Sequence, residues 1–143
     1  MKKSFIFFYL LLAASLILLD QLAKSFLLKT KLNSGFISFF CNENLSWGIK
    51  LPTGFFYFLW VIIIGSILLK LFTDKKSAFT LPLILILSGG ISNLVDRLTQ
   101  GCVIDFINLK IWPVFNLADV YITIGIAMLA LKILNKNPRS GTS

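Results

Sequence analysis

The chain has 143 residues, of which 57% are hydrophobic and only 14% are charged, and its mean hydropathy is +0.86. Soluble domains carry about 25% charged residues, so this composition excludes a disordered chain and a disulfide-rich secreted module and disfavours a soluble globular domain. The net charge of +8 fits lysines and arginines at the ends of membrane spans and requires no nucleic acid. We therefore expect one small polytopic membrane domain covering residues 1–143.

Four apolar runs predict an all-α membrane protein, a four-transmembrane-helix bundle. A span needs about 20 residues, and the runs cover about residues 4–28, 55–72, 78–95 and 115–134. The first run follows two lysines, as in a signal peptide. It is longer than a typical signal-peptide core and lacks a small-residue cleavage site, so we expect it to be retained.

Two longer segments connect these spans on one side, at about 29–54 and 96–114. The aromatic and β-branched stretch 36–40 predicts short strands at the membrane surface, which gives the bundle a small β-containing outer loop region. Trp112 suits the membrane interface. The polar tail, 135–143, is expected to be disordered.

Basic residues predict the orientation. Lys70, Lys75 and Lys76 lie at or beside the short turn between the second and third runs, and further basic residues flank both termini, whereas those on the other side are spread over longer segments. Because lysine and arginine favour the cytoplasmic side, we expect both termini in the cytoplasm and both long segments outside.

The residue inventory restricts the chemistry. The absence of histidine excludes histidine-based triads and histidine-held zinc or haem, and two cysteines are too few for an all-cysteine zinc site, so we expect no metal and no cofactor. Cys41 and Cys102 can form one disulfide in an oxidising compartment, although two isolated cysteines are more often free. Carboxylate chemistry must come from six acids: Asp20, Glu43, Asp74, Asp96, Asp105 and Asp119.

Five of these acids fall on the outer side, and Asp74 alone faces the cytoplasm. Asp20 and Lys24 are four residues apart and share a helix face, so the simplest interpretation is a buried ion pair that fixes helix packing. Asn93, Asp96 and Arg97 also share a face.

An interfacial anchor with a helix–helix hydrogen bond from Asn93 would explain that second group without catalysis. The Gly89-Gly90 pair that precedes it would let another helix approach closely.

Asp105 and Asp119 are the candidates for catalysis. Asp105 lies in an apolar stretch just outside a span, and Asp119 enters the fourth span fourteen residues later. Two carboxylates that meet share one proton, so one can act as general base on a water and the other as general acid on a scissile amide. The spacing leaves an alternative open, in which the two are separate interfacial acids that solvate the loop and cap the fourth span.

Other functions also remain open at this point. A proton relay or small transporter could use the same acids, and a non-catalytic assembly factor could use them to hold helices together. A serine–lysine protease would take Lys24 as its base and Ser46 or Ser92 as its nucleophile.

Four blocks then occur in order along the chain: Asp20–Lys24, Gly89–Arg97, Val103–Phe106 and Phe115–Asp119. Together they resemble the lipoprotein signal peptidase (signal peptidase II) family of bacterial inner-membrane aspartic proteases. The resemblance spans nearly the whole chain, and its specificity comes from the four blocks together.

The resemblance implies an aspartic endopeptidase of the inner membrane with its active site at the outer face. The implied substrate is a prolipoprotein that carries diacylglyceryl on its lipobox cysteine and is cleaved just before that cysteine. Membrane lipids are the other expected partner, and we expect a monomer. The expected residues are catalytic Asp105 and Asp119, site-lining Asn44, Asn93, Arg97 and Asn116, and supporting Asp20, Lys24 and Asp96.

One segment departs from the family pattern. The first outer loop of the family usually has an asparagine followed by a run like Gly-Ala-Ala-Phe, where this chain has Asn44 to Ile49 with bulkier residues. We assign the family asparagine to Asn44. Trp47 above all predicts an altered substrate groove, although an interfacial anchor would explain this tryptophan equally well.

Overall fold

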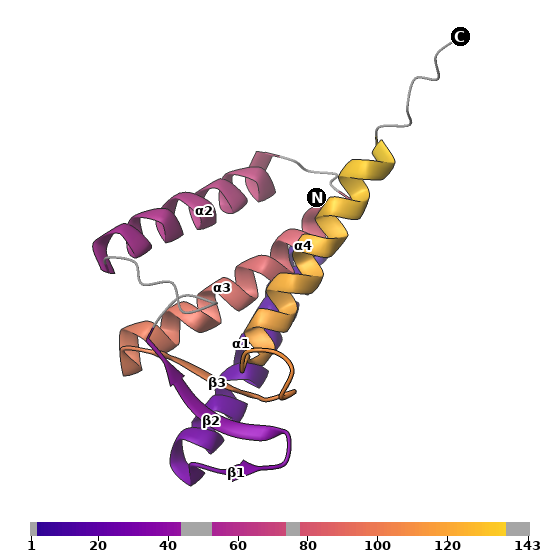
Figure 1. Ribbon diagram of the computed structural model, residues 1–143. Coiled ribbons are helices and arrows are strands. Elements are labelled where there is room, and N and C mark those ends of the chain that lie inside the picture. The colour runs from indigo at the N-terminus through magenta and orange to yellow at the C-terminus, as the bar shows by residue number, and fades with distance from the viewer. Residues whose placement is uncertain (1–2, 44–52, 74–77, 137–143) are drawn as a thin grey trace.

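A computed structural model describes residues 3–43, 53–73 and 78–136 (Figure 1). Four helices and three strands follow in chain order: α1 (Lys3–Thr30), β1 (Asn33–Ser34), β2 (Ile37–Asn42), α2 (Thr53–Thr73), α3 (Thr80–Gln100), β3 (Val103–Ile107) and α4 (Leu117–Lys136). Each helix contains most of one predicted apolar run. The predictions made for Asn44, Trp47 and Asp74 fall outside the described residues.

Three of the helices are long and apolar enough to cross a membrane. Their candidate spans are Ile6–Thr30, Thr80–Gln100 and Leu117–Asn135, and α2 contributes a shorter apolar stretch, Tyr57–Thr73. Many apolar side chains of α1, α2 and α4 are exposed on the isolated chain, as lipid-facing surfaces are. The predicted tail began too early, because α4 continues through Lys136, and residues 137–143 are not described.

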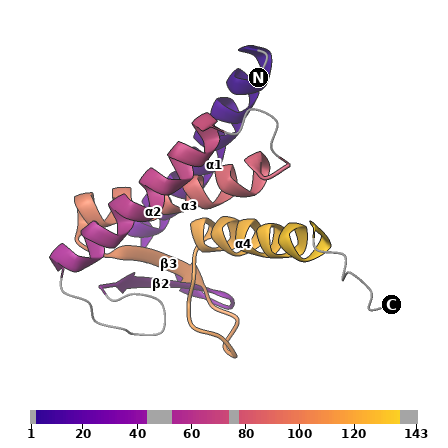
Figure 2. The same cartoon turned by 90° about the horizontal axis from the view of Figure 1, so that it is seen from above.

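Helix α3 packs against each of the other helices (Figures 1 and 2). Against α4 it presents Gly89, where an added Cβ would lie 2.4 Å from the carbonyl oxygen of Ala118. The close helix approach predicted at this glycine is therefore confirmed. Against α2, Leu83 and Leu87 form an apolar cluster with Ile64 and Ile67.

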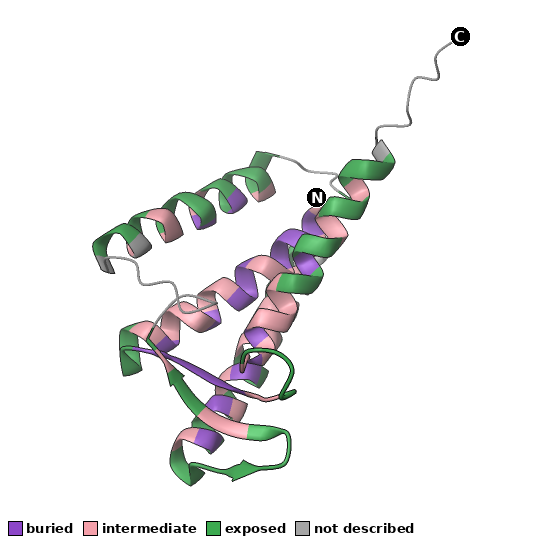
Figure 3. Ribbon diagram, viewed as in Figure 1, coloured by how far each residue is buried: buried purple, intermediate pink, exposed green. Residues whose placement is uncertain are grey.

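An antiparallel sheet in the order β1-β2-β3 lies at the end of α1 and α3 and beside the start of α4 (Figure 1). Strands β1 and β2 confirm the short strands predicted for the first long segment. Strand β3 was not predicted, because the segment 96–114 was expected to form a loop. It is a short apolar run that packs on α1 and α3, and it is the most buried part of the sheet (Figure 3).

Cys41 and Cys102 form a disulfide with their Cα atoms 5.6 Å apart. The structure thereby settles the alternative that the sequence left open. The bond joins Cys41, the second-last residue of β2, to the residue just before β3. Cys102 is buried, whereas Cys41 is exposed.

Candidate active site

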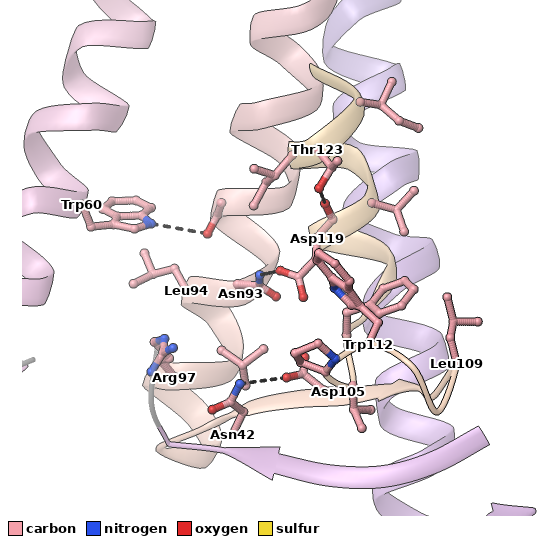
Figure 4. Close-up of a pocket in the computed structure, with 18 residues that line it drawn as sticks. Asn42, Trp60, Asn93, Leu94, Arg97, Asp105, Leu109, Trp112, Asp119 and Thr123 are labelled. Carbon is pink, nitrogen blue, oxygen red and sulfur yellow. Dashed lines mark hydrogen bonds between the residues drawn. The ribbon is translucent and has the colours of Figure 1, made fainter. Parts of the chain in front are cut away.

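A cavity of about 640 Å³ opens between the sheet, α2, α3 and the first turns of α4 (Figure 4). The cavity is lined by polar side chains and by apolar ones that include Trp60, Leu94 and Ile124. The structure brings four of the predicted site residues together in this lining, with one residue that was not predicted: Asn93, Arg97, Asp105, Asp119 and Asn42.

Asp105 comes from β3 and is 2% exposed. Its two carboxylate oxygens accept hydrogen bonds from the side-chain amides of Asn42, at 3.0 Å, and Asn116, at 2.7 Å. The pKa of this carboxyl is raised to about 6, mainly by burial and also by the nearby Asp119 carboxylate, while the hydrogen bonds from Asn42 and Asn116 and the charge of Lys24 oppose the rise. Asp105 is thus poised to hold or release a proton near neutral pH.

Asp119 is fixed by the way α4 begins. Asn116 precedes the helix, and its side-chain oxygen accepts the backbone N–H of Asp119 at 2.9 Å, while the Asp119 carboxylate accepts the backbone N–H of Asn116 at 3.3 Å. This reciprocal arrangement is a capping box, which satisfies two backbone donors at a helix start. Asn93 from α3 donates a further hydrogen bond to Asp119 at 2.9 Å.

Asn116 joins the two aspartates. Its fully buried side-chain amide donates to Asp105 at 2.7 Å and to Asn93 at 3.1 Å, while its oxygen accepts the backbone N–H of Asp119. Asp119 therefore does cap α4, as one of the sequence alternatives stated. Because it lines the same cavity as Asp105, the two acids are not separate interfacial groups.

A buried ion cluster lies next to the segments that carry the two aspartates. Lys24 is 2% exposed, and its ammonium lies 2.6 Å from the Asp20 carboxylate and 2.8 Å from that of Asp96. It also donates to the side-chain oxygen of Asn93 at 2.9 Å. The predicted Asp20–Lys24 ion pair is confirmed, and it has a third member. The interpretation of Asp96 as an interfacial anchor is wrong, because this residue is 3% exposed and paired with Lys24.

The two carboxylates of this cluster also accept hydrogen bonds from backbone N–H groups next to the cavity aspartates. Asp20 accepts the backbone N–H of Ala118 at 3.1 Å, next to Asp119. Asp96 accepts the backbone N–H of Ile104 at 3.1 Å, next to Asp105. One ion cluster thus anchors the residues adjacent to both cavity aspartates, which explains why such costly buried charges occur here.

Two hydrogen-bond partners at the site were not predicted from the sequence. Asn42 supplies the amide that reaches Asp105, whereas Asn44, two residues later, received the assignment and lies outside the described residues. Gln21 donates from its side chain to Asp96 at 2.8 Å and to Ser92. The nearest sequence signal for Asn42 was the strand pattern, which ends at this polar residue.

Arg97 lines the same cavity as the two aspartates, across from them (Figure 4), and its charge interacts with those of Asp105 and Asp119. A cation at the mouth of an acidic site can orient a substrate carbonyl. Ser92 does not meet the requirement for a nucleophile, because it is fully buried and its hydroxyl donates to Asp20 at 2.7 Å. The other candidate nucleophile, Ser46, lies outside the described residues.

A family model described as signal peptidase (SPase) II matches residues 12–135. The chain belongs to the signal peptidase II family. A lipoprotein signal peptidase of Caldicellulosiruptor bescii is 33% identical over 137 residues, covering 90% of this chain and 91% of that protein. One from Staphylococcus haemolyticus is 31% identical over 152 residues, covering 93% and 94%.

Two solved structures share the fold of this chain. A structure described as a bacterial membrane enzyme, solved by the in meso method at 2.3 Å resolution, superposes with a TM-score of 0.81 at 25% identity, covering 97% of this chain and 96% of that one. A second, solved at 1.9 Å resolution, gives a TM-score of 0.78 at 26% identity, covering 91% and 94%. The family expected from the four sequence blocks is therefore confirmed.

Proposed function

We propose that the chain is a lipoprotein signal peptidase that works as an aspartic endopeptidase, with Asp105 and Asp119 as its catalytic pair. The observation that carries this proposal is that the two carboxylates share one cavity. They come from β3 and α4, line one cavity and are joined through Asn116.

A water between the two carboxylates is the nucleophile in this mechanism. The ionised aspartate takes a proton from the water while the water oxygen attacks the scissile carbonyl carbon. The protonated aspartate donates its proton to the carbonyl oxygen or to the departing amide nitrogen. Cleavage leaves a carboxylate on one product and an amine on the other. The raised pKa of Asp105 supports this scheme, because a carboxyl with a pKa of about 6 shares its proton readily with a neighbour near neutral pH.

The mixed lining of the cavity supports the substrate class. The carboxylates of Asp105 and Asp119 suit a peptide bond, and apolar lining residues such as Trp60 and Ile124 suit hydrocarbon chains. A diacylglyceryl-modified prolipoprotein presents both parts side by side, since its scissile bond directly precedes the lipidated cysteine. The curated relatives are named lipoprotein signal peptidases, which supports the same substrate.

We further propose that α2 is a fourth span, that both termini are cytoplasmic, and that the sheet lies on the outer face of a bacterial inner membrane. The Cys41–Cys102 disulfide supports this orientation, because disulfides persist in oxidising compartments outside the cytoplasm. We also propose that the active unit is a monomer.

A proton relay or transporter would need ionisable groups along a path through the bilayer. Here Asp20, Asp96, Asp105 and Asp119 are instead linked at the sheet end of the helices by one hydrogen-bond network. This gathering favours the peptidase.

The decisive experiment is a gel-shift assay of a lipidated prolipoprotein with the wild type, Asp105→Asn and Asp119→Asn. Each substitution is expected to lower kcat at least about 100-fold, the contribution of a positioned acid or base. Glu43→Gln is the matched control, because Glu43 is exposed and follows the same sheet. Wild-type cleavage by either aspartate variant would refute the catalytic pair, and proton flux in proteoliposomes that is lost in both would favour the relay.

A further inference from the structure

The pairing of β2 with β3 changes register along its length. Ile37 lies opposite Ile107, but beyond an irregularity between Ile37 and Phe40 the pairing is shifted, and Phe40 lies opposite Asp105. The pairing at the Ile37–Ile107 end of the two strands therefore does not set the register at the other end, where Asp105 lies. That register needs a restraint of its own, because a slip of one residue moves every side chain to the other face of a strand.

Two bonds restrain this end of the ribbon, one on each face. The Asn42 amide reaches Asp105 diagonally across one face, at 3.0 Å. Cys41 and the residue opposite it, Ile104, point to the other face, and there Cys41 is bonded to Cys102, again on a diagonal. The disulfide and the Asn42–Asp105 hydrogen bond thus share one register.

We propose that the Cys41–Cys102 disulfide is a positioning element for the active site, which holds β2 in the register that places the Asn42 amide on the Asp105 carboxylate. This inference rests on the proposed role of Asp105 as a catalytic residue. The cysteines act through Asn42 and do not touch the substrate themselves.

The rest of the surroundings makes β2 the strand that needs this bond. The start of β3 is already held by Asp96, whose carboxylate accepts the Ile104 backbone N–H at 3.1 Å. Cys102 itself is buried between α3 and β3 at 2% exposure. The disulfide therefore ties the exposed Cys41, and with it Asn42, to a rigid point of the bundle.

The test begins with the state of the cysteines in the full-length enzyme purified from membranes. Alkylation with and without prior reduction, read by mass spectrometry, is expected to show both thiols blocked until reduction. Two free thiols in the active enzyme would overturn the proposal.

Kinetics then separate positioning from general stability. Asn42→Ala is expected to lower kcat about tenfold with little change in KM, the effect of one hydrogen bond to a charged group. The Cys41→Ser/Cys102→Ser variant is expected to lose a similar factor, and reduction of the wild type with a phosphine is expected to reproduce that loss. A disulfide variant with wild-type kcat would overturn the proposal.

Combining the changes gives the sharpest result. If the disulfide acts through Asn42, the triple variant loses no more kcat than Asn42→Ala alone, whereas independent effects would multiply to about 100-fold and refute the coupling. Asp105→Asn is assayed alongside. An active Asp105→Asn enzyme would refute the proposed catalytic role, whereas an inactive one with unaffected disulfide variants would refute only this inference.

The pH profile is a second readout that a merely structural bond would leave in place. The Asn42 hydrogen bond lowers the pKa of Asp105, so its loss in the disulfide variant is expected to move the limb set by Asp105 to higher pH. The other groups that act on Asp105 are unchanged in this variant: Asn116 and Asp119 at α4, Lys24 on α1 and Arg97 on α3. An unshifted limb would contradict the proposed route through Asn42.

Discussion

The Gly89→Ala substitution tests whether the approach of α3 to α4 sets the position of Asp119. A Cβ at Gly89 would lie 2.4 Å from the Ala118 carbonyl oxygen and 2.7 Å from Cγ1 of Ile122. Ordinary contact begins at 3.4 Å, so the backbone of α4 has to move by about 1 Å, which is 3.4 minus 2.4. Because Ala118 directly precedes Asp119, that shift carries the carboxylate away from the Asn93 amide, now 2.9 Å away.

The expected loss follows from this displacement. A misplacement of 1 Å at a reacting group costs about 100-fold in rate, and overpacking of this kind costs about 1–3 kcal/mol of stability. The assay is kcat and KM for a lipidated prolipoprotein in detergent micelles, with the thermal midpoint measured on the same preparation. We expect Gly89→Ala to remain folded with kcat reduced by roughly that factor.

Gly65→Ala is the matched control, since it makes the same chemical change in the apolar helix α2. A Cβ at Gly65 would meet nothing within 4 Å. This variant is expected to keep wild-type kcat. A folded Gly89→Ala enzyme with wild-type kcat, or an equal loss in Gly65→Ala, would refute the reasoning.

Three further predictions concern charge and hydrogen bonding around the site. Lys24→Met leaves two buried carboxylates without their ion-pair partner and is expected to lower the free energy of unfolding by about 3–5 kcal/mol, seen as a fall in the thermal midpoint. The control Lys29→Met, at an exposed position, is expected to show no such fall, and equal falls would contradict the ion cluster. The pKa of Asp105 is raised from 3.8 to about 6 by folding, so its neutral form stabilises the native state below about pH 4, and this contribution of about 3 kcal/mol is lost as the pH rises to about 6. Thermal midpoints across that window are expected to fall for the wild type relative to Asp105→Asn, and parallel curves would exclude the raised pKa. Asn116→Ala is expected to lower kcat about 10–100-fold with KM nearly unchanged. The control is Asn108→Ala, which removes a hydrogen bond to Ser38 and is expected to keep full activity. An effect on KM alone would show that Asn116 does not join the aspartates.

The helices were predictable because each is dominated by one long apolar run. The Asp20–Lys24 pair was equally accessible, since residues four apart on a helix always share a face. The third member of the cluster, Asp96, was not predictable, because the residue pattern of one helix does not show which face of another helix it packs against. Sequence spacing placed Asp96 on a face with Asn93 and Arg97, but the structure turns Asp96 into the interior and leaves Arg97 on the cavity.

The sheet shows a different limit. Asn42 and Asn44 are two residues apart, so an extended strand would place both on the same face, and alternation does not distinguish them. What selects Asn42 is its diagonal position relative to Asp105, which depends on the irregularity between Ile37 and Phe40. Strand β3 escaped prediction because a five-residue stretch after a helix, apolar except for Asp105, suits a buried strand and a membrane-surface loop equally well.

The pairing of Asp20 with Lys24 inside one helix has a consequence for biogenesis. Helix α1 is synthesised before α3 and α4, and it has to enter the bilayer before its partners on those helices exist. Because both charges of the pair belong to α1, they neutralise each other as soon as that helix forms, and the cost of inserting two ions is reduced. The ion pair then offers α3 and α4 a polar contact on an otherwise apolar helix surface, where Asp96 pairs with Lys24 and the backbone N–H of Ala118 donates to Asp20.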